Sequence, residues 1–206
     1  MRSPLDAFDR RNLLTYVSLI CGIAALVAAS SKTASWAGAA IGLAVIADTF
    51  DGRFAKRFPS DATRRQLGTE LDSLADAIVF GAVPVACALL LTDASSPLSR
   101  GLLWMAACVY AAAAITRLAF FNVKVAEPQI GFIGIPVPVA ALLWSTALLT
   151  HPSAVASAAV IAVAAAGMIA PLRIRRPVGL GLALFTCWPL ALVLGHLLRA
   201  SLLLRS

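Results

Sequence analysis

Long apolar runs constrain this chain more than any other feature of its sequence. About 20 apolar residues suffice for a helix to cross the hydrocarbon core of a bilayer. Because the backbone finds no water there, each spanning run has to form a helix. Seven runs can be marked, at residues 13–29, 36–50, 71–91, 102–123, 132–149, 154–172 and 178–204.

The composition agrees with these run lengths. Hydrophobic residues make up 60% of the chain and charged residues 13%, against about 45–50% and about 25% in soluble domains. We therefore predict an all-α fold, a polytopic membrane helix bundle with six to seven transmembrane helices in one domain over residues 1–206. The last run is long and holds Pro189, so it could span, kink or fold back.

The basic residues predict the topology. Of 17 basic residues, 13 lie in the N-terminal segment or in and beside the links near residues 53–67, 124–131 and 173–177, and four lie elsewhere. Cytoplasmic links carry an excess of Lys and Arg, which predicts that these links and the N-terminus are cytoplasmic in a multi-pass protein of the cell membrane. Residues 1–11 are predicted to form a helix on the membrane surface, with Leu5 and Phe8 dipping in.

The net charge of +7 bears on the partners of such a protein. On a membrane protein it indicates topology and contact with anionic lipid headgroups. The basic residues show no interleaving with aromatic residues of the kind that binds nucleic acid. We therefore expect membrane lipids, and no nucleic acid, as partners.

The acidic residues are few and unevenly placed. Six of the ten fall between Asp48 and Asp76, and four of those stand at the ends of apolar runs, where a carboxylate is costly and indicates function. Asp48 and Asp51 are spaced i, i+3, and Asp72 and Asp76 are spaced i, i+4, so each pair shares one helix face. If the two helices pack antiparallel, the four carboxylates converge on one site at the cytoplasmic side.

Four converging carboxylates require cations, because like charges cannot stay close and ionised alone. Hard divalent ions with oxygen ligands, Mg²⁺ or Mn²⁺, suit such a site, and two of them form a clamp for phosphoryl displacement. The alternative is a salt network at headgroup level with the neighbouring basic residues. That alternative explains charge near the interface, but it does not explain two in-phase pairs of aspartates.

The stretch from Asp48 to Asp76 reads DTFDGRFAKRFPSDATRRQLGTELDSLAD. It resembles the signature of the CDP-alcohol phosphotransferase family, D-x2-D-G-x2-A-R followed by G-x3-D-x3-D. The matching positions are Asp48, Asp51, Gly52, Ala55, Gly68, Asp72 and Asp76. The chain departs from the signature at Lys56, which replaces an arginine, and in a longer gap before Gly68.

Further segments are similar to the phosphatidylserine synthase branch of that family, namely ELDSLADAIVFGAVPV, TRLAFFNV, GFIGIPVPVAALLW and MIAPLRIRRP. Phe120 stands where the branch has an arginine. The resemblance implies an enzyme that transfers the phosphatidyl group of CDP-diacylglycerol to a small alcohol such as L-serine, with CMP as product. It also implies a homodimer.

The resemblance implies roles for single residues as well. Asp48, Asp51 and Asp72 would hold two divalent ions, with Asp76 near the second ion and acting as general base. The implied contacts to the CDP group are Asp48, Gly52, Ala55, Lys56, Gly68 and Asp72. Arg117 and Asn122 could line the acceptor pocket, with snorkelling and helix capping as the alternative.

Other functions stay open from the sequence. Within the same chemistry, the acceptor could be glycerol 3-phosphate, inositol phosphate or choline. A divalent-cation transporter is an alternative of another class, but it predicts acids near mid-membrane beside broken helices. A family member that binds lipid without catalysis is a third alternative, and four intact acids argue against it.

Overall fold

The computed structural model describes residues 8–124, 131–175 and 179–203, and helices dominate it. The helices are η2 (Arg10–Asn12), α1 (Leu13–Ser30), α2 (Ala34–Ala55), α3 (Ala62–Asp76), η3 (Ala77–Ala82), α4 (Val83–Leu91), α5 (Pro97–Lys124), α6 (Val137–Leu148), α7 (Ala154–Ile169) and α8 (Leu180–Leu203). Two short strands, β1 (Gly131–Ile133) and β2 (Arg173–Arg175), pair antiparallel. Each of the seven predicted apolar runs contains or overlaps one of these helices.

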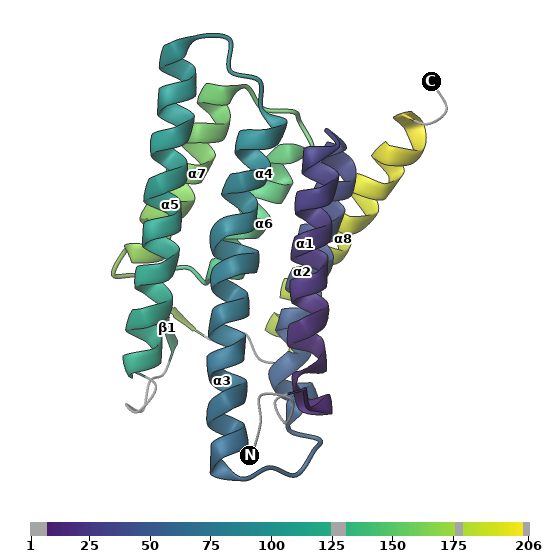
Figure 1. Ribbon diagram of the computed structural model, residues 1–206, viewed down its shortest axis with the longest axis vertical. Helices are drawn as coiled ribbons and strands as arrows, with labels where there is room; N and C mark the ends of the chain where they lie inside the picture. The colour runs from purple at the N-terminus through teal and green to yellow at the C-terminus, as the bar shows by residue number, and fades with distance from the viewer. Residues whose placement is uncertain (1–7, 125–130, 176–178, 204–206) are drawn as a thin grey trace.

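The helices form one bundle in which α3, η3 and α4 run end to end as a long central rod (Figure 1). The helix α2 packs against α1, α6 and α8, while α5 packs against α7. Within the part of the chain that the structure describes, four helices are long and apolar enough to cross a membrane: Arg10–Ser30, Ala62–Leu91, Pro97–Val123 and Leu180–Leu203. With the shorter apolar helices Val137–Leu148 and Ala154–Ile169, this architecture is that of a polytopic helical membrane protein, as predicted.

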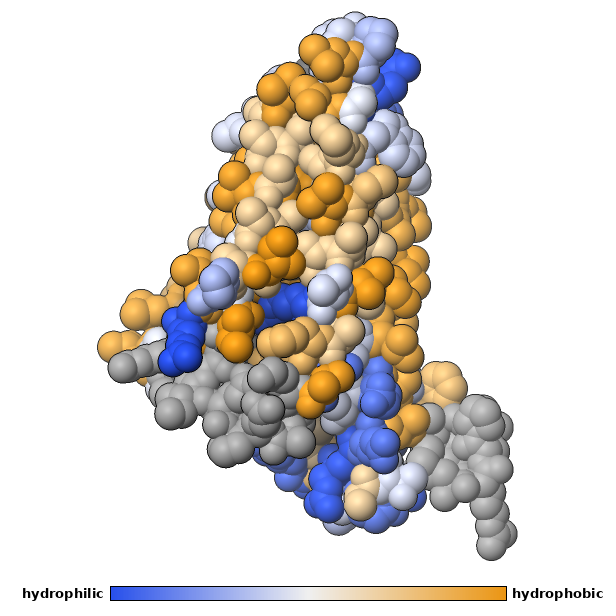
Figure 2. Space-filling view, turned by 90° about the vertical axis from the view of Figure 1, so that its left-hand side faces the viewer, coloured by the Kyte–Doolittle hydropathy of each residue, from blue (hydrophilic) through white to orange (hydrophobic). Residues whose placement is uncertain are grey.

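The surface of the bundle is apolar where a membrane would contact it. Figure 2 shows a broad hydrophobic band between hydrophilic ends on one side of the molecule. Ile20 and Val27 on α1, and Leu194 and Leu198 on α8, are each more than half exposed. Large side chains turned outward suit lipid, because lipid tails are as apolar as the side chains themselves.

Small and polar residues hold the helices together inside the bundle, as is common in membranes. On α2, a Cβ atom at Gly38 would overlap the ring of His196, so α8 approaches α2 closely there. The Ser145 hydroxyl of α6 donates to the Gly38 carbonyl oxygen at 3.1 Å and lies 3.2 Å from His196 Nε2. These contacts join α2, α6 and α8 at one buried point.

The central rod contains a π-helical segment, η3, directly after Asp76. Pro84 lies just beyond it and has no N–H, so it cannot donate to the carbonyl of Phe80 four residues earlier. The Tyr110 hydroxyl of α5 donates to this carbonyl oxygen at 2.9 Å. A π-helical turn holds one residue more than an α-helical turn, which shifts the rod's phase by about 100°. The segment therefore sets the direction in which Asp72 and Asp76 face.

Three features differ from the sequence prediction or extend it. The rod begins at Ala62 and not near residue 71, because the Asp61 carboxylate caps α3 by accepting from the Arg64 N–H at 2.7 Å. Two of the links between helices form the paired strands β1 and β2, although the sequence shows no alternation of apolar and polar residues there. Gly134 follows β1 with φ +72°, and a Cβ atom there would overlap the Met168 carbonyl. The predicted surface helix over residues 1–11 falls largely on residues 1–7, outside the described residues.

Candidate metal and transfer site

The carboxylates of Asp48, Asp72 and Asp76 come together between α2 and the central rod. Each of the three offers an oxygen, and these oxygens all lie within 4.8 Å of one another. Asp48 belongs to the last third of α2, whereas Asp72 and Asp76 lie in the last turns of α3. The i, i+4 spacing brings the latter two onto one face. The predicted convergence of the two aspartate pairs is therefore seen for three of the four residues.

Asp51 stands beside this group. Its carboxyl interacts with the carboxyl of Asp72 and with that of Asp48. It also accepts a hydrogen bond of 3.3 Å from the hydroxyl of Thr15, near the start of α1. The helix α1, in which the sequence predicts no site residue, thus contributes a polar contact to the site.

The donor set of this cluster fits a divalent cation. The four acids are half-buried, and none of them belongs to an ion pair within 4.0 Å among the described residues. Of the nearby basic residues in the signature stretch, Arg64 pairs with Asp9 and Asp61. This observation disfavours the headgroup-level salt network. Carboxylate oxygens at this spacing are the ligands that Mg²⁺ and Mn²⁺ prefer.

Arg117 on α5 is the cation that faces the cluster. Its side chain is 7% exposed and interacts electrostatically with Asp76. Its guanidinium carbon lies 5.7 Å from the ring centroid of Phe121. A buried arginine can bind carboxylate or phosphate oxygens through charge-assisted hydrogen bonds.

Asn122 lies on α5 beyond Arg117, toward the end of the helix, and contacts the rod. The Ser73 hydroxyl donates to Asn122 Oδ1 at 3.1 Å, so the residue next to Asp72 is joined to α5. The two predicted acceptor residues, Arg117 and Asn122, therefore both lie beside α3.

The small residues of the signature divide into two kinds. Gly68 packs closely, because a Cβ atom there would lie 3.2 Å from Asn12 Oδ1. At Gly52 a Cβ atom would meet nothing within 4 Å, which leaves open space beside Asp51. Ala55 ends α2 and Lys56 caps it, with the Lys56 side chain exposed.

Asn12, Thr15 and Ser73 are polar contacts of the site that sequence reasoning did not single out. A signal was present, since Asn12 and Thr15 are polar residues at the start of an apolar run, spaced i, i+3 on one face. Ser73 lies between Asp72 and Asp76 and carried no signal of its own. Its role depends on the placement of α5.

The fold and this site define a class of protein: a helical membrane protein with a half-buried carboxylate cluster between two of its helices. The family model described as CDP-alcohol phosphatidyltransferase matches residues 11–170, which include the whole cluster and Arg117. The chain therefore belongs to the CDP-alcohol phosphatidyltransferase family. The helix α8 lies beyond the matched residues.

Curated relatives carry the name CDP-diacylglycerol–serine O-phosphatidyltransferase. That of Mycobacterium leprae is 30% identical over 135 residues, covering 63% of this chain and 43% of the relative. That of Helicobacter pylori strain J99 is 34% identical over 144 residues, covering 68% and 56%. That of Methanocaldococcus jannaschii is 30% identical over 139 residues, covering 66% and 61%. The chain thus spans about half the length of the curated relatives it matches.

Proposed function

We propose that this protein transfers the phosphatidyl group of CDP-diacylglycerol to the hydroxyl of L-serine, with phosphatidylserine and CMP as products. The observation that carries the proposal is the group of Asp48, Asp72 and Asp76 oxygens within 4.8 Å of one another. The family match over residues 11–170 and the names of the relatives support the substrate class. Serine is favoured over other small alcohols because the curated relatives of Mycobacterium leprae, Helicobacter pylori and Methanocaldococcus jannaschii are named for it.

Two divalent ions, Mg²⁺ or Mn²⁺, would be held by Asp48, Asp51, Asp72 and Asp76. When bound, they would offset the charge of the pyrophosphate and of the oxygens on the reacting phosphorus. Thr15 would orient Asp51 through its hydrogen bond. The open space at Gly52, together with Ala55 and Lys56, would receive the cytidine end of the donor, with Gly68 letting Asn12 of η2 lie close to α3.

Asp76 would act as general base toward the acceptor. Its carboxylate would take the proton of the serine hydroxyl, and the serine oxygen would form the new bond to the phosphorus that carries diacylglycerol. The bond from that phosphorus to the bridging oxygen would break, and CMP would leave with that oxygen. Arg117, beside Asp76, would hold the serine carboxylate, and Asn122 would line the same pocket.

The experiment is CMP release by purified protein with CDP-diacylglycerol and Mg²⁺ or Mn²⁺. The acceptors are L-serine, glycerol 3-phosphate, inositol phosphate, inositol and choline, each in a separate reaction. Release with serine is expected. Release with a different acceptor alone would contradict the serine assignment and keep the reaction class, and no release with any acceptor would contradict both.

Two further proposals concern the setting of this site. The excess of basic residues in the links at the Asp-cluster end favours a cytoplasmic site, which labelling of single introduced cysteines in oriented vesicles would test. Family membership leads us to expect a homodimer. Light scattering on the purified protein, corrected for detergent, would give its mass.

A further inference from the structure

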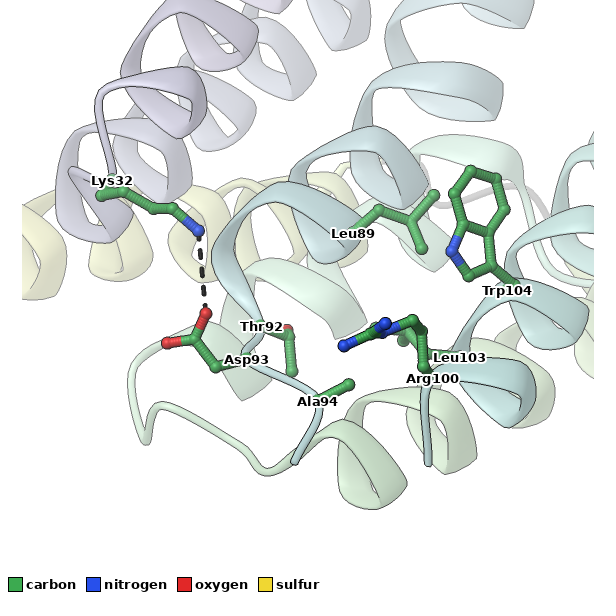
Figure 3. Close-up of a pocket in the computed structure, with 8 residues that line it drawn as sticks. All are labelled: Lys32, Leu89, Thr92, Asp93, Ala94, Arg100, Leu103 and Trp104. Atoms are coloured by element: carbon green, nitrogen blue, oxygen red, sulfur yellow. Dashed lines mark ion pairs between the residues drawn. The ribbon is translucent and has the colours of Figure 1, made fainter. Parts of the chain in front are cut away.

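A cavity of about 270 Å³ opens at the other end of the bundle from the aspartate cluster. It lies where α1 and α4 end and α5 begins (Figure 3). The 15 residues from Asp76 to Leu91 (91 − 76) span roughly 20 Å at the rise of an α-helix. The cavity is therefore separate from the transfer site and close to the opposite membrane surface.

Two cations and one carboxylate stand at this cavity. Lys32 Nζ lies 3.8 Å from Asp93 Oδ1 and also donates to the Leu90 carbonyl oxygen. Arg100 lines the cavity and takes part in none of the ion pairs found among the described residues. In Figure 3 its guanidinium extends toward Thr92 and Ala94, across the cavity from Lys32. The cavity thus carries a net positive charge.

The remaining wall is apolar. Leu89, Leu103 and Trp104 line it, and Trp104 is 56% exposed on the outer surface of α5. Tryptophan is enriched at the membrane–water interface, where one part of the ring meets apolar chains and its N–H meets polar groups. Cationic groups above an apolar wall at this depth match the two parts of a phospholipid.

The backbone at Lys32 supplies a further observation. Lys32 follows the end of α1 with φ +58°, a conformation that glycine adopts without cost and other residues adopt at some cost. A lysine at a position that favours glycine indicates that its side chain contributes something. Its ammonium group reaches the last turn of α4 and the edge of the cavity.

We propose that this cavity binds the phosphate of an anionic phospholipid from the leaflet opposite the transfer site. Arg100 and Lys32 contact the phosphate oxygens, and one acyl chain lies along Trp104 and Leu89. The volume admits a headgroup and not a whole lipid, whose chains stay in the bilayer. Free phosphate shares the charge that Arg100 recognises, but it leaves the apolar wall uncovered.

The test is native mass spectrometry of the full chain, titrated with phosphatidylglycerol. The wild type is compared with the double variant Lys32→Gln, Arg100→Gln, and with Arg199→Gln as the control. Arg199 is a matched control because it influences His151 at this end of the bundle and does not line the cavity. The double variant is expected to lose one retained phosphatidylglycerol, with an apparent affinity roughly 10- to 30-fold weaker.

Four outcomes would overturn the proposal. The first is equal lipid retention by the double variant and the wild type, and the second is an equal loss in Arg199→Gln. The third is equal retention of phosphatidylcholine, which would show an apolar groove without charge recognition. The fourth is displacement of the lipid by inorganic phosphate at millimolar concentration, which would indicate a site for the free anion. CMP release by the double variant is expected to match the wild type, which shows that the variant is folded.

Discussion

The Tyr110 hydroxyl donates a 2.9 Å hydrogen bond to the Phe80 carbonyl oxygen, and both residues are fully buried. This bond replaces the one that Pro84 cannot make, and it stabilises the π-helical segment η3 next to Asp76. Segments of this kind occur frequently at functional sites. Here the segment lies between the apolar helix α4 and the helix α3, which carries Asp72 and Asp76.

Replacing Tyr110 by Phe should therefore lower the stability of the protein and weaken its activation by Mg²⁺. The Phe80 carbonyl would lose its partner in a buried place, at a cost of about 1–3 kcal/mol, and Asp76 would be less firmly oriented. We expect a lower thermal midpoint in detergent and a higher Mg²⁺ concentration for half-maximal CMP release. The control is Thr186→Val, which removes a hydroxyl that donates within its own helix, to the Leu182 carbonyl oxygen. Equal effects of the two substitutions would contradict the assignment.

Asp76→Asn should abolish turnover while leaving donor binding largely intact. The amide cannot take the proton of the acceptor, and loss of a general base costs about 10²- to 10⁴-fold in rate. The rate is measured as CMP release, and binding as retention of CDP-diacylglycerol by the purified variant. Wild-type turnover in Asp76→Asn would remove the base assignment, whereas loss of donor binding would make Asp76 chiefly a ligand.

Metal removal should affect stability as well as activity. A cation that binds only the folded protein at 100 times its dissociation constant stabilises it by about 2.7 kcal/mol. We expect EDTA to lower the thermal midpoint and stop CMP release, with excess Mg²⁺ or Mn²⁺ restoring both. Asp72→Asn should lose the metal-dependent rise in midpoint, because Asp72 contributes an oxygen to the cluster. If added metal raises the thermal midpoint of Asp72→Asn as much as that of the wild type, the ion binds elsewhere.

Arg117→Gln should raise the KM for serine and leave the KM for CDP-diacylglycerol nearly unchanged. The loss of a charged hydrogen bond to the serine carboxylate corresponds to roughly 10- to 100-fold. Arg117→Lys should recover part of this effect, since lysine keeps the charge and loses the planar fork. The exposed Arg173 of β2 gives the control, Arg173→Gln. A change confined to the KM of the donor would contradict an acceptor role.

Gly38→Ala should destabilise the bundle, because the new methyl group would overlap the His196 ring. Overpacking of a buried contact typically costs about 1–3 kcal/mol. The control is Gly195→Ala on α8, where a Cβ atom would make ordinary contact with Leu149 at 3.8 Å. Thermal unfolding of the two variants in the same detergent compares them directly. Equal midpoints would show that α8 moves to accommodate the methyl group.

Much of the candidate site could be predicted from sequence. The spacing of Asp72 and Asp76 places both carboxylates on one helix face whatever else the fold does, and the pairing with Asp48 followed from antiparallel packing of consecutive helices. The i, i+3 spacing likewise places Asp51 on the face of Asp48, but the contacts of its carboxyl could not be predicted. Its partners Thr15 and Asp72 belong to two other helices, and their positions depend on how those helices pack.

Run lengths and the spacing of the acids are enough to predict a bundle of apolar helices with most of its acids near one end. Both results follow from local properties, since run length decides whether a segment spans and periodicity decides which side chains share a face. The folded structure was needed to show that Tyr110 bonds to Phe80, that Ser73 bonds to Asn122, and that Lys32 and Arg100 line one cavity. Each of these pairs joins residues far apart in the chain, so its formation depends on side-chain packing between helices.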